Sequence, residues 1–415
     1  MAKTMNRLIA RWWWTISLAL LLGFFIFGYK QMYFHQDDID WFIMANRPFW
    51  GVIVAPIADH VNYLWRVLLK AQWNAFGLYF PGYLTVSFLM HAGVIWLIYK
   101  LSLLTSGRRD LAGIAAIIYT INTNWTEVVL WISGQTISIT VLFVLLAMIS
   151  IWNKRGEVTS LFLAGMTSAL ALGLPIAAML VYGYKSSKKH LLSSIKITKV
   201  GWGAILSLLS VIGVYFFLST DGTKIEFGRQ WLSQVIQVWG LAIINTVIGR
   251  LIVPFDRFEM FRIIFVLFLM VCGAIKWKRQ LYELWKDEWS RFLILQMGFY
   301  YLIVAAGRSQ YGVGMMRAER YSYLGVALFL LLVIRALRNV KLGRWILLVP
   351  VIVLVQCFGL YQRSRAYVQR PQQLKLLIQT IQTDRSRVDP EAFLPDFVFG
   401  YERLKYFDLM SLIKD

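Results

Sequence analysis

Long apolar runs separated by short polar segments dominate the chain. A helix needs about 20 predominantly apolar residues to cross the hydrocarbon core of a bilayer, and runs of roughly that length recur throughout. They cover 12–30, 82–104, 111–131, 133–152, 158–184, 200–220, 259–276, 291–306, 319–338 and 345–362. The pattern predicts an all-α polytopic membrane protein. Basic residues precede the first run and no small-residue cleavage site follows it, so we interpret it as a retained anchor rather than a signal peptide.

Composition supports this class. Apolar residues make up 58% of the 415 positions and charged residues 16%, whereas soluble domains have about 45–50% and about 25%. Such a chain is not a soluble globular enzyme, a disordered chain or a disulfide scaffold. The net charge of +21 fits the excess of Lys and Arg in cytoplasmic loops. No basic face or zinc spacing accompanies that charge, so nucleic acid is not an expected partner.

The basic clusters also predict a topology. A cytoplasmic N-terminus and cytoplasmic basic loops are consistent only if 158–184 is a hairpin of two short spans that breaks near Gly173 and Pro175. The apolar segment 231–253 must then enter and leave on one side, or lie in the interface. The prediction is about eleven spans within a membrane domain, 1–362, and a small exoplasmic tail, 363–415. The tail contains an amphipathic stretch from Leu374 to Ile381.

The first exoplasmic loop, 32–81, holds the first candidate site. It opens with the sequence HQDDID, in which Asp37 and Asp38 are adjacent. Adjacent carboxylates repel, so one pKa rises and suits a general base; oxygen ligands of this kind also suit a divalent cation. A solvated acidic turn is the alternative. The many Trp and Tyr residues of the loop predict amphipathic helices on the bilayer surface.

Two later exoplasmic segments add charge close to apolar runs. Glu127 opens the stretch VVLWISG, and a carboxylate near membrane depth is either functional or paired with an arginine. Arg308, Arg317 and Arg320 lie before the run 319–338. Arginine forks suit a departing phosphate, although arginines also grip lipid headgroups without any chemistry.

Several motifs, in order, resemble the GT-C superfamily of membrane glycosyltransferases. The resemblance is strongest to bacterial relatives of the transmembrane and tetratricopeptide-repeat O-mannosyltransferases, although the repeats are missing. It rests on HVNYLWR, FGLYFPGY, TNWTEVVLWISGQ and RAERYSYL, and it covers roughly 30–335. The chain departs from the family pattern at Asn62-Tyr63, Asn122, Trp125 and Gln135.

The resemblance implies a GT-C-like bundle that transfers a sugar from a polyprenyl-phosphate donor to a hydroxyl acceptor on the exoplasmic face of a cell membrane. By analogy, Asp37 or Asp38 would be the base, and Arg317, Arg320 and Arg308 would hold the donor phosphate. The pocket would be formed by His60, Arg66, Glu127 and Tyr321. Two alternatives stay open: a transporter or flippase of lipid-linked substrates, and an inactive relative that binds glycolipid.

Overall fold

The structure is a computed structural model that describes residues 2–35, 38–54, 62–186, 195–218, 229–255, 258–276, 278–308, 319–384, 389–390, 392, 394–395 and 405–413. Helices form nearly all of it, as the apolar pattern predicts. One short exception is an antiparallel pair, β1 (Tyr184–Ser186) and β2 (Ile195–Ile197), in which Tyr184 is opposite Ile197.

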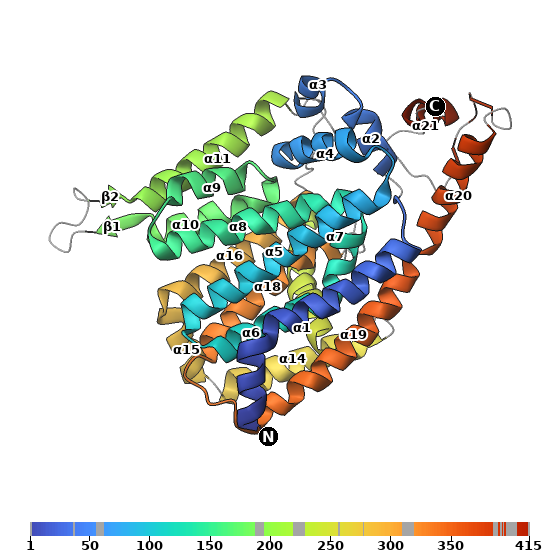
Figure 1. Ribbon diagram of the computed structural model, residues 1–415. Coiled ribbons are helices and arrows are strands. Elements are labelled where there is room, and N and C mark those ends of the chain that lie inside the picture. Colours follow the sequence, from blue (N-terminus) through green and yellow to red (C-terminus); the bar gives the residue numbers. More distant parts are fainter. Residues whose placement is uncertain are drawn as a thin grey trace.

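The first half of the chain forms a series of helices that wrap around a central α5 (Figure 1). They are α1 (Ala2–Gln31), α2 (Asp38–Ala45), α3 (Phe49–Val54), α4 (Tyr63–Phe76), α5 (Phe80–Ser106), α6 (Arg109–Ile121), η1 (Thr123–Trp125), α7 (Thr126–Leu130), η2 (Ile132–Gly134), α8 (Gln135–Asn153), α9 (Glu157–Gly165), η3 (Ala169–Leu172) and α10 (Gly173–Tyr182).

The second half packs against this series and closes the bundle. It consists of α11 (Lys199–Leu218), α12 (Arg229–Leu241), the π-helical η4 (Ala242–Gly249), α13 (Arg250–Ile252), α14 (Glu259–Lys276), α15 (Lys278–Lys286), α16 (Glu288–Arg308), α18 (Glu319–Ala336), η7 (Gly343–Leu347), α19 (Leu348–Ala366), α20 (Gln369–Thr383) and α21 (Tyr406–Leu412). The predicted amphipathic stretch of the tail lies within α20, whose Leu374, Ile378 and Ile381 are buried.

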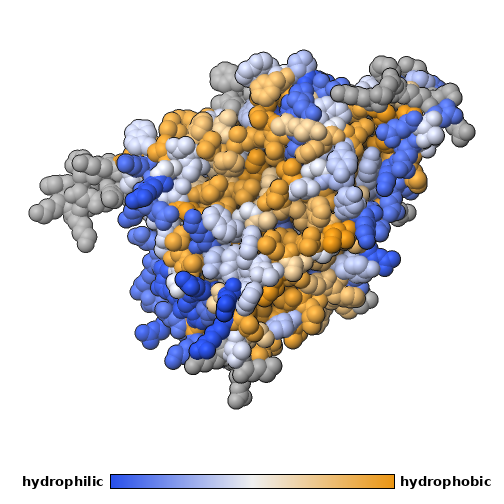
Figure 2. All heavy atoms as spheres, in the orientation of Figure 1, coloured by the Kyte–Doolittle hydropathy of each residue, from blue (hydrophilic) through white to orange (hydrophobic). Residues whose placement is uncertain are grey.

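Five helices of the described chain are long and apolar enough to cross a membrane. They are Arg7–Gln31, Phe80–Ser106, Ile132–Asn153, Val235–Ile252 and Glu288–Gly307. A sixth is counted if α14 and α15, which are bent by 85° at their junction, form one span. Large apolar side chains on α14 face outward, with Ile275 77% and Met260 70% exposed. Figure 2 shows an apolar belt between hydrophilic margins, as a bilayer requires.

Two predicted spans are broken where the sequence analysis expected otherwise. The run 111–131 is not one helix, because α6 ends at Ile121 and the extended Asn122 accepts a hydrogen bond from the amide of Asn124 at 3.0 Å. The run 158–184 does break, but before η3 at Ser168, whose hydroxyl caps Leu170. Pro175 instead lies in the first turn of α10, where its missing amide hydrogen costs nothing.

The described parts of the first loop form α2, α3 and α4, and a buried amide pair fixes α4 to the bundle. The Gln72 side chain of α4 donates to Oε1 of Gln135 at 2.8 Å, and Gln135 donates back at 3.2 Å and to the Ser87 hydroxyl at 2.9 Å. Aromatic rings complete the joint, with Phe42 of α2 stacked on Trp73 of α4 at 5.2 Å. These contacts hold α2, and therefore Asp38, against α4 and α5.

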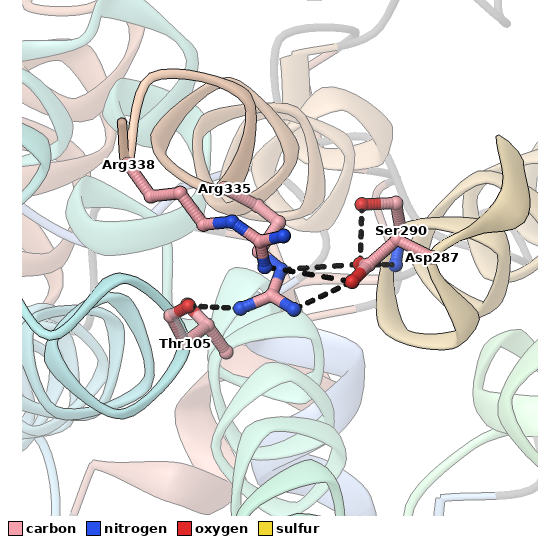
Figure 3. A network of polar contacts seen from close by, with 5 residues as sticks. All are labelled: Thr105, Asp287, Ser290, Arg335 and Arg338. Atoms are coloured by element: carbon pink, nitrogen blue, oxygen red, sulfur yellow. Dashed lines mark hydrogen bonds and ion pairs between the residues drawn. The ribbon is translucent and has the colours of Figure 1, made fainter. Parts of the chain in front are cut away.

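A second polar network fixes the opposite end of α5, which at 27 residues is about 40 Å long. Arg335 of α18 binds both carboxylate oxygens of Asp287, at 3.1 and 2.5 Å, and also donates to the carbonyl of Thr105 at the end of α5 (Figure 3). Arg108 donates in turn to the Val340 carbonyl beyond the end of α18. Arg335 thus satisfies a carbonyl in the last turn of α5, and Arg108, just beyond α5, satisfies a carbonyl of the segment that follows α18.

Arg335→Gln is expected to lower the free energy of unfolding by about 3 kcal/mol at pH 7, because it leaves a largely buried carboxylate without its main partner. Burial alone would raise the pKa of the Asp287 carboxyl, but hydrogen bonds from Arg335 and Ser290 hold that pKa well below its usual value. A carboxyl whose pKa is lower in the native than in the unfolded protein contributes stability at pH values above its unfolded pKa. The stability lost in Arg335→Gln should therefore shrink below about pH 4.

Denaturant unfolding in detergent at pH 7 and pH 3 measures this effect. Lys286→Gln is the matched control, since its pair with Glu283 is more than half exposed and should change stability by less than about 0.5 kcal/mol. If the two substitutions changed the free energy of unfolding equally, the contacts of Asp287 would not stabilise the protein.

Candidate functional site

The centre of the candidate site is the broken segment between α6 and α8. Asn122 ends α6, and the short elements η1, α7 and η2 follow before α8 begins at Gln135. The turn needs a glycine at position 134, because a Cβ there would lie 2.6 Å from the carbonyl oxygens of Glu127 and Val128. The segment therefore folds back on itself and presents Glu127, Trp131 and Ser133 to the surrounding helices.

Gly134→Ala is expected to destabilise the protein by about 1–3 kcal/mol, the usual effect of overpacking against backbone atoms that cannot move. Gly23→Ala on α1 is the matched control, since nothing lies within 4 Å of its added methyl group and alanine favours the helix. Thermal unfolding of both proteins measures the difference. A Gly134→Ala protein as stable as the control would mean that the turn is not constrained.

Asp38 reaches this segment from the first loop. Its side chain is buried at the start of α2, where Oδ2 accepts the backbone N–H of His35 at 2.7 Å. Oδ1 accepts the backbone N–H and the hydroxyl of Ser133, both at 3.3 Å. An acidic residue in the first turn also suits the helix dipole. The sequence alternative of a solvated turn is wrong for Asp38, whose exposed fraction is 0%.

Glu127 and Arg320 form an ion pair on the other side of the segment. Nη1 of Arg320 donates to Oε1 of Glu127 at 3.1 Å, and the Arg320 backbone N–H donates to Oε2 at 3.2 Å. Both side chains are less than one-fifth exposed. Of the two sequence interpretations of Glu127, partnership with an arginine is therefore confirmed. The guanidinium also lies over Trp131, 5.0 Å from the ring centroid.

Trp131 connects the two groups. The imidazole of His35 lies 4.8 Å from the Trp131 ring centroid, and Arg320 lies over the same indole. Because His35 also donates its amide to Asp38, the start of α2 is linked through His35 and Trp131 to the start of α18.

The structure adds a cationic cluster that the sequence analysis missed. Arg250 is buried and donates to Oδ1 of Asn124 at 3.0 Å. Burial raises the pKa of the Tyr367 hydroxyl, the Glu127 carboxylate raises it further, and Arg363, Arg250 and Arg320 lower it. The Tyr367 ring also lies 6.1 Å from the His35 ring, next to the Trp131 contact. Asn124 and Arg250 lie inside the apolar segments 111–131 and 231–253, and nothing local to either residue indicates their pairing.

The other predicted residues fall into two groups. Asp37, His60 and Arg317 lie outside the described residues, and Arg308 is described only as the end of α16. Tyr321 is buried next to Arg320, with its ring centroid 5.3 Å from the guanidinium.

Arg66 belongs to the first loop. Its Nη1 donates to the Ile53 carbonyl at 3.1 Å, so it ties α4 to α3. Burial lowers the pKa of its guanidinium, and the Tyr63 hydroxyl partly offsets this. This contact gives Arg66 a structural role in the first loop. The resemblance implied instead that Arg66 lines the pocket.

Within the part of the chain that the structure describes, no group of three or more His, Cys, Asp or Glu side chains is arranged to hold a metal ion. Asp37 lies outside that part, so a divalent cation at Asp37 and Asp38 stays a prediction. Comparison with protein-family models, with curated proteins and with solved structures finds no match.

Proposed function

We propose that the chain is an integral membrane glycosyltransferase of the GT-C type, which transfers a sugar from a polyprenyl-phosphate donor to a hydroxyl acceptor. The observation that carries the proposal is that Asp38 and Arg320 both bind the segment between α6 and α8, Asp38 through Ser133 and Arg320 through Glu127 and Trp131. A carboxylate and a guanidinium cluster at one site are the two groups that such a transfer requires. The motif resemblance described above supports the same class.

In the proposed reaction, Asp38 accepts the proton of the acceptor hydroxyl. The hydroxyl oxygen forms a bond to the anomeric carbon while the bond from that carbon to the lipid phosphate oxygen breaks. The phosphate leaves with the electron pair and is stabilised by Arg320 and its cationic neighbours. The reaction inverts the anomeric carbon. Because Asp38 is fully buried, the acceptor hydroxyl must displace the Ser133 contact.

The proposed setting is a bacterial cell membrane with the site on the exoplasmic face. The network of Arg108, Arg335 and Arg338 lies at the end of α5 that is remote from the first loop, and a basic end favours the cytoplasm. About eleven spans remain our proposal for the whole chain, in which shorter helices such as α10 and α11 join the five long ones.

The test is donor turnover by the purified protein in liposomes. A polyprenyl-phosphate hexose with labelled sugar should be consumed, with release of polyprenyl phosphate, and lipid-linked sugars should accumulate in a deletion strain. Movement of labelled donor across vesicles without turnover would favour a flippase.

A non-catalytic glycolipid-binding protein is the second candidate, and the burial of Asp38 favours it. Donor binding without turnover or transport would support that function and exclude the enzyme.

A further inference from the structure

A groove between α1 and the α19–α20 junction lies outside the candidate site. Its volume is about 570 Å³, and it is lined by Phe27, Gln31, Tyr361, Arg365, Val368 and Gln372. The two walls meet at its ends, where the Phe27 and Tyr361 rings pack edge to face at 6.1 Å and Gln372 donates to Gln31 at 3.4 Å. Figure 1 shows α1 and α19 along the same edge of the bundle.

On both walls of the groove, aromatic side chains are followed one helical turn later by polar side chains. Phe27 and Gln31 are four residues apart on α1, and Tyr361 and Arg365 are four residues apart on α19. Residues at that spacing lie on one helix face, one turn apart. Below the aromatic level the outer surfaces carry exposed apolar side chains, including Ile26, Leu354 and Phe358. This layering is that of a bilayer at its headgroup boundary.

The polar level is positively charged. Arg365 is exposed and its guanidinium lies 5.9 Å from the Tyr361 ring centroid, and Lys30 is exposed beside Gln31. Among the described residues, no carboxylate forms an ion pair with Arg365. A guanidinium with flanking amides recognises phosphate oxygens by forked hydrogen bonds.

The groove and the candidate site use opposite faces of the same helical junction. Arg363 and Tyr367 are four residues apart, and the Tyr367 ring lies 6.1 Å from the His35 ring of the candidate site, whereas Tyr361 and Arg365 line the groove. A shift of two residues turns a helix by about 200°, so the two pairs face away from each other. An occupant of the groove would therefore hold the element that carries Arg363 without entering the site.

We infer that this groove binds an anionic membrane phospholipid, with its phosphate at Arg365 and its acyl chain along Phe27 and Phe358. The layering identifies a lipid, and the cationic polar level selects a negative headgroup. A phospholipid fits better than the sugar carrier because the lining residues face away from Arg320 and Trp131. The inference does not depend on the proposed sugar transfer.

The experiment compares thermal unfolding of the full-length protein in detergent with added phosphatidylglycerol or phosphatidylcholine. Phosphatidylglycerol should raise the melting temperature more than phosphatidylcholine does. Arg365→Gln should increase the phosphatidylglycerol concentration for half-maximal effect by about tenfold, the loss of one good charge-assisted contact. Arg365→Lys should recover part of the lost affinity for phosphatidylglycerol, since the positive charge remains. Arg109→Gln, which removes an exposed guanidinium from the opposite end of α5, should leave that concentration unchanged.

Three results would overturn the inference. The first is that the two lipids or the two substitutions do not differ. That is, phosphatidylglycerol and phosphatidylcholine raise the melting temperature of the parent protein equally, or Arg365→Gln and Arg109→Gln change the half-maximal phosphatidylglycerol concentration equally. The second is an Arg365-dependent shift with inorganic phosphate alone, which would indicate a free anion. The third is such a shift with polyprenyl phosphate but not phosphatidylglycerol, which would make the groove a carrier site. None of these outcomes bears on donor turnover, so the proposed function stands or falls separately.

Discussion

The Asp38→Asn protein is expected to fold and insert but to transfer sugar about 10²–10⁴-fold more slowly, the usual contribution of a general base. Asparagine has the size of aspartate, but His35 and Ser133 donate to different oxygens of Asp38, so the single carbonyl oxygen of asparagine keeps one of these contacts and its NH2 group faces the other donor. The lost contact should lower the stability by about 1–3 kcal/mol. It cannot accept the acceptor's proton at neutral pH. Initial rates of labelled sugar transfer in liposomes, with unfolding curves for both proteins, measure the two effects.

Asp40→Asn is the matched control, because it makes the same change two residues away on α2. Its transfer rate should stay within about twofold of the parent, since Asp40 is only partly buried and lies about 200° around α2 from Asp38. Unchanged transfer in Asp38→Asn, in Asp37→Asn and in the double variant would remove the carboxylate-base hypothesis.

Arg320→Gln is expected to reduce donor turnover by about 10²–10³-fold, which is typical for the loss of one group that stabilises developing negative charge. The single variant also leaves the Glu127 carboxylate without its ion-pair partner, so it should unfold more easily. The double variant Glu127→Gln with Arg320→Gln replaces the ion pair by two neutral amides and should recover most of that stability.

The double variant separates a structural role from a role in the reaction. If Arg320 stabilises the departing phosphate, the double variant should be stable and still slow. If Arg320 only holds Glu127 in place, stability and turnover should recover together. Donor turnover and unfolding curves are measured on the parent, on Glu127→Gln, on Arg320→Gln and on the double variant. These four proteins form a double-mutant cycle.

Periodicity and length predicted the helices well where they are long. The runs 82–104 and 133–152 became α5 and α8 with ends within two residues, because a continuous apolar run in a membrane chain has few alternatives to a helix. The run 111–131 has the same apolar content, and it failed as a single helix at Asn122. There a side chain supplies the hydrogen bond that the helix would have supplied.

The site was predicted in part. Asp38, Glu127 and Arg320 were chosen from the sequence because charges beside apolar runs are costly, and the structure brings all three to one segment. Trp131 and Tyr367 could not be chosen, because aromatic residues are frequent throughout the chain. Arg250 was missed because its partner Asn124 is 126 residues away, and no local pattern reports such a distant pairing.

The crossed contacts of Arg108 and Arg335 have a mechanical consequence. Arg335 holds the Thr105 carbonyl near the end of α5 and Arg108 holds the Val340 carbonyl beyond the end of α18, so sliding the two helices lengthwise past one another would break both contacts. A tilt about that junction would preserve them. Because α5 is about 40 Å long, a small tilt at this pivot becomes a larger displacement at its far end, beside the first loop.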